Sequence, residues 1–119
     1  MLSKKYRFHS RGGVNYVYKK GQTIREPGLS LVFCDNTRGF TRLTVVVSKK
    51  VTKTAVSRNR IRRRVYEVLR ENMEYIPKKR DYIFVVYDKK VGVMSHDELV
   101  RMLGELVLKS KVCYNRNNG

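Results

Sequence analysis

A run of arginines on a helical apolar repeat is the feature that most restricts how this chain can fold. Five arginines fall within the seven positions from Arg58 to Arg64. Apolar residues recur through and beyond this run at the spacing of one helix face; they are Ile61, Val65, Val68, Leu69 and Met73. A helix with such a face packs against a core, so its arginines are held at fixed positions. Recognition of a shaped polyanion requires charges that are placed in this way.

A helical wheel, with Ile61 at zero and about 100° per residue, places most of the apolar residues within about 100° of arc. The residues predicted on roughly the opposite side are Asn59, Arg63, Tyr66 and Arg70, flanked by Arg60 and Arg62. The alternative is a solvated face held by ion pairs between residues four apart. Such pairs would join Arg63 to Glu67 and Arg70 to Glu74, and would leave several arginines over.

The charge balance favours a nucleic acid as partner. The 119-residue chain has 27 Lys and Arg against 10 Asp and Glu, a formal net charge of +17. Self-repulsion of this size is relieved by a polyanion, and nucleic acid is a better candidate than an anionic membrane surface. No stretch approaches the ~20 apolar residues of a membrane span. Cys34 and Cys113 lack metal-ligand or disulfide spacing, so we expect a cytoplasmic protein.

Four segments before the arginine run are typical of a helix and three strands. Residues 11–20 have helical apolar spacing and end in two lysines and Gly21, a common C-cap. Residues 22–26 have some β character and end at a Pro-Gly turn signal. Residues 29–34 and 41–48 are stronger strands. The short loop between these two predicts that they pair as an antiparallel hairpin.

The rest of the chain adds a helix, a strand and a second helix. The arginine helix ends near Met73, and Pro77 prevents it from continuing. Residues 81–87 read as another strand, and the capping box at 95–98 starts the last helix. The order α-β-β-β-α-β-α predicts an α+β fold in one domain spanning residues 1–119. Amphipathic helices would cover one mixed sheet as an α/β sandwich.

Several motifs occur in a fixed order along the chain. A valine-rich strand ends in Ser48-Lys49-Lys50, and a short link leads to the helix that carries Arg58-Asn59-Arg60. Tyr18-Lys19-Lys20-Gly21 precedes them, and Asp81-Tyr82 and the capping box follow. A lone Arg-Asn-Arg sequence would carry no weight. The complete set, which covers nearly the whole chain, closely resembles the bacterial ribonuclease P protein.

The resemblance implies an accessory subunit of an endoribonuclease. In that family an RNA subunit, using bound Mg²⁺, removes the 5′ leader of precursor transfer RNA, and the protein assists it. The implied partners are ribonuclease P RNA, in a 1:1 complex, and the precursor 5′ leader. No metal site is expected on the protein itself. The implied fold is like domain 2 of ribosomal protein S5, with a left-handed β-α-β crossover where the general rule favours a right-handed one.

The resemblance also assigns roles by position. Contacts with the RNA subunit would come from Arg58, Asn59, Arg60, Arg62, Arg63, Lys49, Lys50 and Lys53. Contacts with the leader would come from Tyr18, Val14, Ser48 and Phe33. Val14 replaces a second aromatic of the family, so a stacking partner is missing or is supplied by Tyr16 or Phe33. Packing against the strands is the other reading of these aromatics. Arg64 replaces a usual leucine and Tyr66 a common basic residue, which would alter the outer face of the arginine helix.

Nothing in the sequence predicts catalysis by the protein. His9 and His96 have no acidic partner at a suitable spacing, and the glutamates of the arginine helix interleave with cations. Asp81 and Asp88 lie seven residues apart and would face opposite sides of a strand. We therefore expect no catalytic residue. The alternatives to a ribonuclease P subunit are a ribosomal-type or general structural RNA-binding protein and, less favoured, a protein nuclease.

Overall fold

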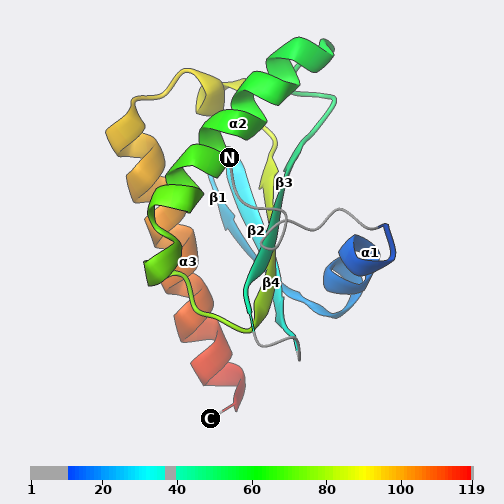
Figure 1. The fold of residues 1–119 in the computed structure, drawn as a ribbon, viewed down its shortest axis with the longest axis vertical. Coiled ribbons are helices and arrows are strands. Elements are labelled where there is room, and N and C mark those ends of the chain that lie inside the picture. Colours follow the sequence, from blue (N-terminus) through cyan, green and yellow to red (C-terminus); the bar gives the residue numbers. More distant parts are fainter. Residues whose placement is uncertain (1–10, 37–39, 119) are drawn as a thin grey trace.

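Three helices surround a four-stranded sheet in the computed structural model, which describes residues 11–36 and 40–118. The elements follow the predicted order: α1 (Arg11–Lys20), β1 (Gln22–Glu26), β2 (Leu29–Asp35), β3 (Arg42–Val47), α2 (Ala55–Glu71), β4 (Arg80–Val86) and α3 (His96–Asn118). Two 3-10 turns, η1 (Met73–Tyr75) and η2 (Lys89–Gly92), flank β4. Figure 1 shows α2 and α3 on one side of the sheet and α1 on the other.

The sheet has the strand order β1-β2-β4-β3, and this order corrects one prediction. β1 and β2 form an antiparallel hairpin whose turn contains Gly28 at a φ of 91°. The predicted hairpin of β2 with β3 is wrong, because β4 lies between these strands, antiparallel to β2 and parallel to β3. β4 is buried along nearly its whole length, so an interior position, with a neighbouring strand on each side, suits it best.

The two faces of the sheet are covered unequally. The larger core lies beneath α2 and α3 and includes Phe33, Tyr82 and Phe84 from the sheet. On the other face, Val17 of α1 packs on Val32 and Ile83 in a much smaller cluster. Successive strand residues alternate between these faces, as the geometry of a strand requires. The face beneath α1 is therefore the less completely covered one.

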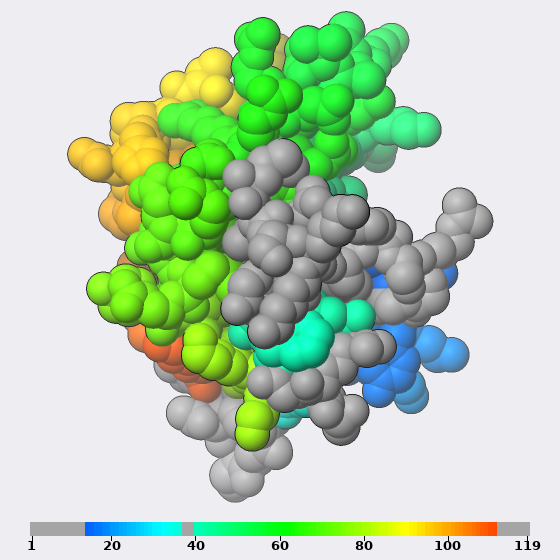
Figure 2. Space-filling view, viewed as in Figure 1, coloured from blue at the N-terminus to red at the C-terminus, as the bar shows by residue number. Residues whose placement is uncertain are grey.

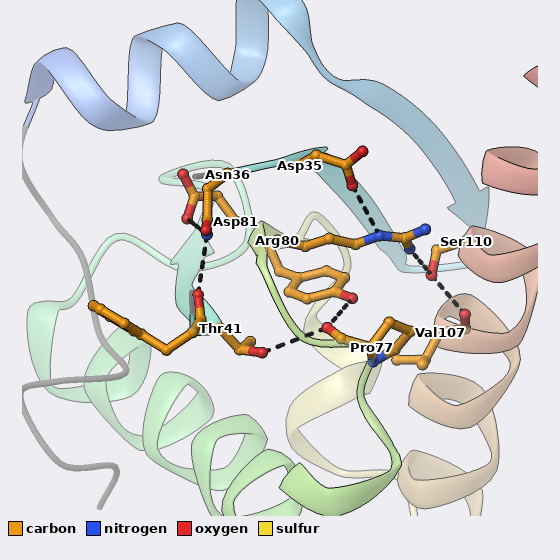
Figure 3. A network of polar contacts seen from close by, with 10 residues as sticks. Asp35, Asn36, Thr41, Pro77, Arg80, Asp81, Val107 and Ser110 are labelled. Atoms are coloured by element: carbon orange, nitrogen blue, oxygen red, sulfur yellow. Dashed lines mark hydrogen bonds and ion pairs between the residues drawn. The ribbon is translucent and has the colours of Figure 1, made fainter. Parts of the chain in front are cut away.

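A polar network fixes the end of the sheet at which β3 and β4 begin. Arg42 donates two hydrogen bonds to the carboxylate of Asp81, with N···O distances of 2.9 and 2.7 Å. Arg80 is 5% exposed, lies 3.3 Å from Asp35 and donates to Ser110 Oγ of α3 at 3.4 Å (Figure 3). The buried carboxylate of Asp81 is thus paired with Arg42, and the buried guanidinium of Arg80 is paired with the exposed Asp35, as buried charges require. Their role is to join β2, β3, β4 and α3.

Candidate nucleic-acid interface

The apolar face of α2 fixes the direction of its arginines. Ile61, Val65, Val68 and Leu69 are all 7% exposed or less and belong to the larger core, as predicted. Thr54 precedes the helix, and its hydroxyl accepts a hydrogen bond from Ser57 N at 3.3 Å. The cap starts the helix at Ala55. The arginine run is thus part of a packed, capped helix.

The link between β3 and α2 is held by hydrogen bonds to its backbone N–H and C=O groups. Ser48 Oγ accepts from Lys50 N at 3.2 Å, and Ser48 O accepts from Val51 N at 3.0 Å. Arg58 reaches back from α2 and donates to the carbonyls of Thr52 and Lys53 at 3.1 Å each. The turn and the arginine together close the link against the first turn of α2. The exposed side chains of Lys49, Lys50 and Lys53 therefore project from a defined segment.

The outer face of α2 presents cations that the described part of the chain does not neutralise. Arg60 and Arg63 are exposed and have no ion-pair partner among the described residues. Arg62 donates to Asn59 Oδ1, which leaves the Asn59 amide group to donate outward. The predicted pair of Arg63 with Glu67 does not form. Glu67 lies 2.9 Å from Arg70 instead, and this hydrogen bond lowers its pKa.

Two residues of α2 lie elsewhere than the sequence predicts. Tyr66 was predicted on the outer side but is 4% exposed, because its hydroxyl accepts from Val45 N at 3.2 Å along the outer edge of β3. Arg64 does not join the outer cations. It donates to the carbonyl of Val91 at 2.9 Å and to that of Met94, and so ties η2 to α2. Neither residue is available as part of an outward basic ridge.

The α1 side of the sheet offers a different kind of surface. Tyr18 is 45% exposed, and partial burial raises the pKa of its hydroxyl, so the ring stays neutral. Val14, one turn earlier, is half-buried against the cluster formed by Val17, Val32 and Ile83. Ser48, also half-buried, follows β3 on the strand face that includes Val46.

Cys34 lies on the same sheet face as Val32, and burial followed by the charges of Asp81 and Asp35 raises the pKa of its thiol. The thiol is therefore kept in its protonated, weakly nucleophilic form. The α1 side of the sheet thus offers groups for binding a ligand, and Cys34 is not activated there as a nucleophile.

Phe33 does not belong to that surface, contrary to the expectation from the resemblance. It is 2% exposed, packs in the larger core beneath α2 and α3, and stacks on Tyr82 with ring centroids 6.4 Å apart. Its position one residue after Val32 turns it to the opposite face of the sheet. A nucleotide on the α1 side cannot reach it. Tyr16, 57% exposed on α1, remains accessible.

Within the described residues, no three His, Cys, Asp or Glu side chains are grouped closely enough to hold a metal ion. The same part of the chain has no helix with the length and apolar character needed to cross a membrane. Its most prominent chemical feature is the set of cations on and beside α2.

Comparison with known proteins identifies the chain's relatives. The model of the Ribonuclease P family matches residues 2–111. The chain belongs to the ribonuclease P protein family. It is 33% identical to the ribonuclease P protein component of Pseudanabaena sp. (strain PCC 6903) over 115 residues, 96% of this chain and 98% of that protein. It is 32% identical to that of Borrelia turicatae (strain 91E135), covering 94% of this chain and 100% of the relative.

Solved structures of ribonuclease P proteins have the same fold. The Staphylococcus aureus protein matches with a TM-score of 0.74 at 28% identity, covering 89% of this chain and 94% of that one. The Thermotoga maritima protein matches with a TM-score of 0.76 at 25% identity, covering 85% and 94%. Membership of the ribonuclease P family entails RNA binding and a part in transfer RNA processing.

Some residues with a structural role were not identified from the sequence. The cap at Thr54 and the contact of Arg58 with two backbone carbonyls depend on how the link folds. Lys89 was not identified either, because only the tertiary structure brings η2 beside α2 and places Lys89 near Arg60. Threonine is a favoured N-cap residue, so Thr54 just before the arginine helix could have been considered as its cap.

Proposed function

We propose that this chain, as the protein component of ribonuclease P, binds the catalytic RNA through α2 and the preceding link and holds the precursor 5′ leader on the α1 side. The observation that carries the first part is the pair Arg60 and Arg63, exposed and unpaired among the described residues on a helix fixed by its core face. Arginine suits this task because its planar fork bonds phosphate in two places.

The RNA-subunit surface consists of the residues assigned by the resemblance. They are Lys49, Lys50, Lys53, Arg58, Asn59, Arg60, Arg62 and Arg63. Arg58 acts mainly by fixing the link, since its guanidinium is bonded to two carbonyls. Arg60 and Arg63 make the direct phosphate contacts. Each contact releases counterions from the RNA, which makes affinity dependent on salt.

The leader surface uses Tyr18, with Val14 and Ser48 beside the sheet. A single strand is bound by a basic surface with an aromatic platform, and stacking of one base on an aromatic ring contributes about 1–3 kcal/mol. Tyr18 is exposed enough to stack, whereas Val14 can offer only apolar contact. Leader binding therefore depends on one ring where the family pattern has two.

Catalysis belongs to the RNA subunit in this proposal. The RNA would use Mg²⁺ for hydrolysis, and the protein would act by binding and orienting the substrate. We propose a 1:1 complex in the cytoplasm, with the whole chain acting as one RNA-binding domain.

Reconstitution tests this function directly. The protein is added to its ribonuclease P RNA at low Mg²⁺, and cleavage of a leader-bearing precursor is measured. We expect the protein to increase leader removal and to favour the precursor over mature transfer RNA. Absence of any increase would refute the proposal. RNA affinity that is indifferent to the leader would favour a general structural RNA-binding protein.

Arg63→Ala tests the contact surface, with Arg101→Ala on α3 as a control of equal charge change. We expect Arg63→Ala to weaken binding of the RNA subunit and to reduce the slope of log affinity against log salt by somewhat under one unit. Binding titrations at several salt concentrations measure both effects. Equal slopes for the two variants would show that Arg63 contributes only to the overall charge.

A further inference from the structure

A hollow lies between the start of α2, the preceding link and η2. Its volume is about 360 Å³. The residues that line it are Val51, Thr52, Ser57, Arg60, Ile61, Lys89, Gly92 and Val93. In Figure 2 the segment that includes η2 lies directly beside α2 in the upper part of the molecule. Three separate parts of the sequence therefore build one concave surface.

The lining combines an apolar floor with a cationic rim. Val51 and Ile61 are 8% and 7% exposed, while Val93 at the rim is 85% exposed. Arg60 and Lys89 are both exposed cations, and none of the described residues that line the hollow is acidic. Thr52 and Ser57 add hydroxyl groups, which can donate or accept hydrogen bonds. A flat, mostly apolar group that carries a negative charge and polar edges fits this chemistry.

The wall formed by η2 is fixed before any ligand binds. Arg64 donates to the carbonyls of Val91 and Met94 on either side of Gly92. Asp88 caps the turn by accepting from Lys90 N at 3.0 Å. A Cβ atom at Gly92 would lie 3.0 Å from Ile61 Cγ1, so glycine allows η2 to approach α2 this closely. Such preorganisation reduces the entropy that binding must overcome.

We propose that this hollow receives one unstacked nucleotide of the RNA subunit, with its base over Val51, Ile61 and Val93 and its phosphate between Arg60 and Lys89. The inference rests on the proposed function, because the partner is the same RNA. Arg60 links the two surfaces, since it belongs both to the outer face of α2 and to the rim of the hollow. Proteins commonly recognise RNA through bases splayed out of loops and bulges.

Lys89→Ala tests the phosphate contact, with Lys90→Ala as its matched control. Both lysines are exposed and lie in η2, but the side chain of Lys90 passes close to Gly28 at the β1–β2 turn. We expect Lys89→Ala to reduce affinity for the RNA subunit about tenfold, as loss of a charged hydrogen bond would. Lys90→Ala should change it less than about twofold. Equal effects of the two substitutions would overturn the proposal.

Ser57→Leu tests occupation of the hollow without a change of charge. The leucine side chain would fill part of the hollow, while the cap would persist because Thr54 bonds the backbone nitrogen of residue 57. We expect lower affinity with an unchanged slope of log affinity against log salt. Unchanged affinity, in a variant whose thermal unfolding matches that of the wild type, would overturn the proposal.

Failure of this inference can be told apart from failure of the proposed function. If the wild-type protein binds the RNA subunit and enhances leader removal but Lys89→Ala behaves like Lys90→Ala, only the nucleotide site is refuted. If the wild-type protein neither binds the RNA subunit nor enhances cleavage, both are refuted. Chemical probing of the RNA with and without protein adds a direct readout. One nucleotide should be protected by the wild type and exposed with Ser57→Leu.

Discussion

At the scale of single residues, Tyr66 shows how a side chain outside the apolar stripe of a helix can still belong to the core. It stands about 140° from Ile61 on the helical wheel, where solvent exposure is expected. β3 is an edge strand of the described sheet, however, and among the described residues no further strand lies beside it to bond the backbone N–H of Val45. The Tyr66 hydroxyl accepts from this N–H and lies 3.4 Å from Thr44 Oγ1. Tyr66 thus satisfies a backbone donor on the edge strand β3, which α2 covers.

Tyr66→Phe should therefore destabilise the protein although it removes only one oxygen atom. The N–H of Val45 would be left buried without an acceptor, which costs roughly 1–3 kcal/mol in the free energy of unfolding. Urea denaturation followed by circular dichroism measures the change. Tyr75→Phe is the control, since Tyr75 is 65% exposed and should change stability by less than about 0.5 kcal/mol. Equal stability of the two variants would contradict the role assigned to Tyr66.

At the scale of elements, α1 and α2 serve different faces of the molecule. α2 packs its apolar face on the larger core and turns arginines outward, whereas α1 covers only part of the opposite sheet face. Tyr18 and Val14 lie on the same side of α1 relative to the buried Val17, and Tyr16 lies on the other side. The division predicts that substitutions on the two helices affect different binding partners.

Tyr18→Ala should weaken binding of leader-bearing precursor while leaving mature transfer RNA nearly unaffected. Loss of one stacked base predicts a change of about 1–3 kcal/mol in the binding free energy of the precursor. Tyr16→Ala removes a similar ring from the other side of α1 and should have a smaller effect. Titration of the reconstituted complex with both RNAs compares the variants. An equal loss for precursor and mature transfer RNA would argue against a leader contact.

At the scale of the whole molecule, the excess of cations makes the free protein and the complex respond oppositely to salt. The net charge is +17, and four carboxylates are in ion pairs in the described part of the chain: Glu26, Asp35, Glu67 and Asp81. Repulsion among the remaining cations destabilises the compact state. Salt screens this repulsion, but it also reduces the gain from counterion release on RNA binding.

Raising KCl from about 0.05 M to about 0.5 M, a change that shortens the Debye length to well under 10 Å, should raise the melting temperature of the free protein. The same change should lower affinity for the RNA subunit by several orders of magnitude. Thermal circular dichroism and binding titrations in one salt series test both statements. A melting temperature that does not change with salt would show that repulsion contributes little to the stability of the fold.

The existence and order of the elements followed from local patterns. The apolar spacing of Ile61, Val65 and Val68 defined the buried face of α2, and α1 ends at Lys20 as predicted. The left-handed cap expected at Gly21 is wrong, because Gly21 does not have a positive φ; a Cβ there would lie 2.5 Å from the carbonyl oxygen of Val17. The capping box also held in part, since Ser95 Oγ accepts from Glu98 N at 3.1 Å. These features depend on neighbours within one or two helical turns. Together with the ordered motifs, they were enough to predict the fold class and the family.

Only the tertiary structure decided which strands pair and where borderline side chains point. The β2–β3 loop was short enough for a hairpin, but the buried β4 took the place between them, and no local pattern records that competition. Phe33 faces the larger core because of register, and Tyr66 and Arg64 turn inward because a strand edge and η2 offer them partners. Such contacts join residues more than 20 positions apart. The sequence by itself determined the arginine helix and its charge, and long-range packing determined which of its side chains stay exposed on the outer face.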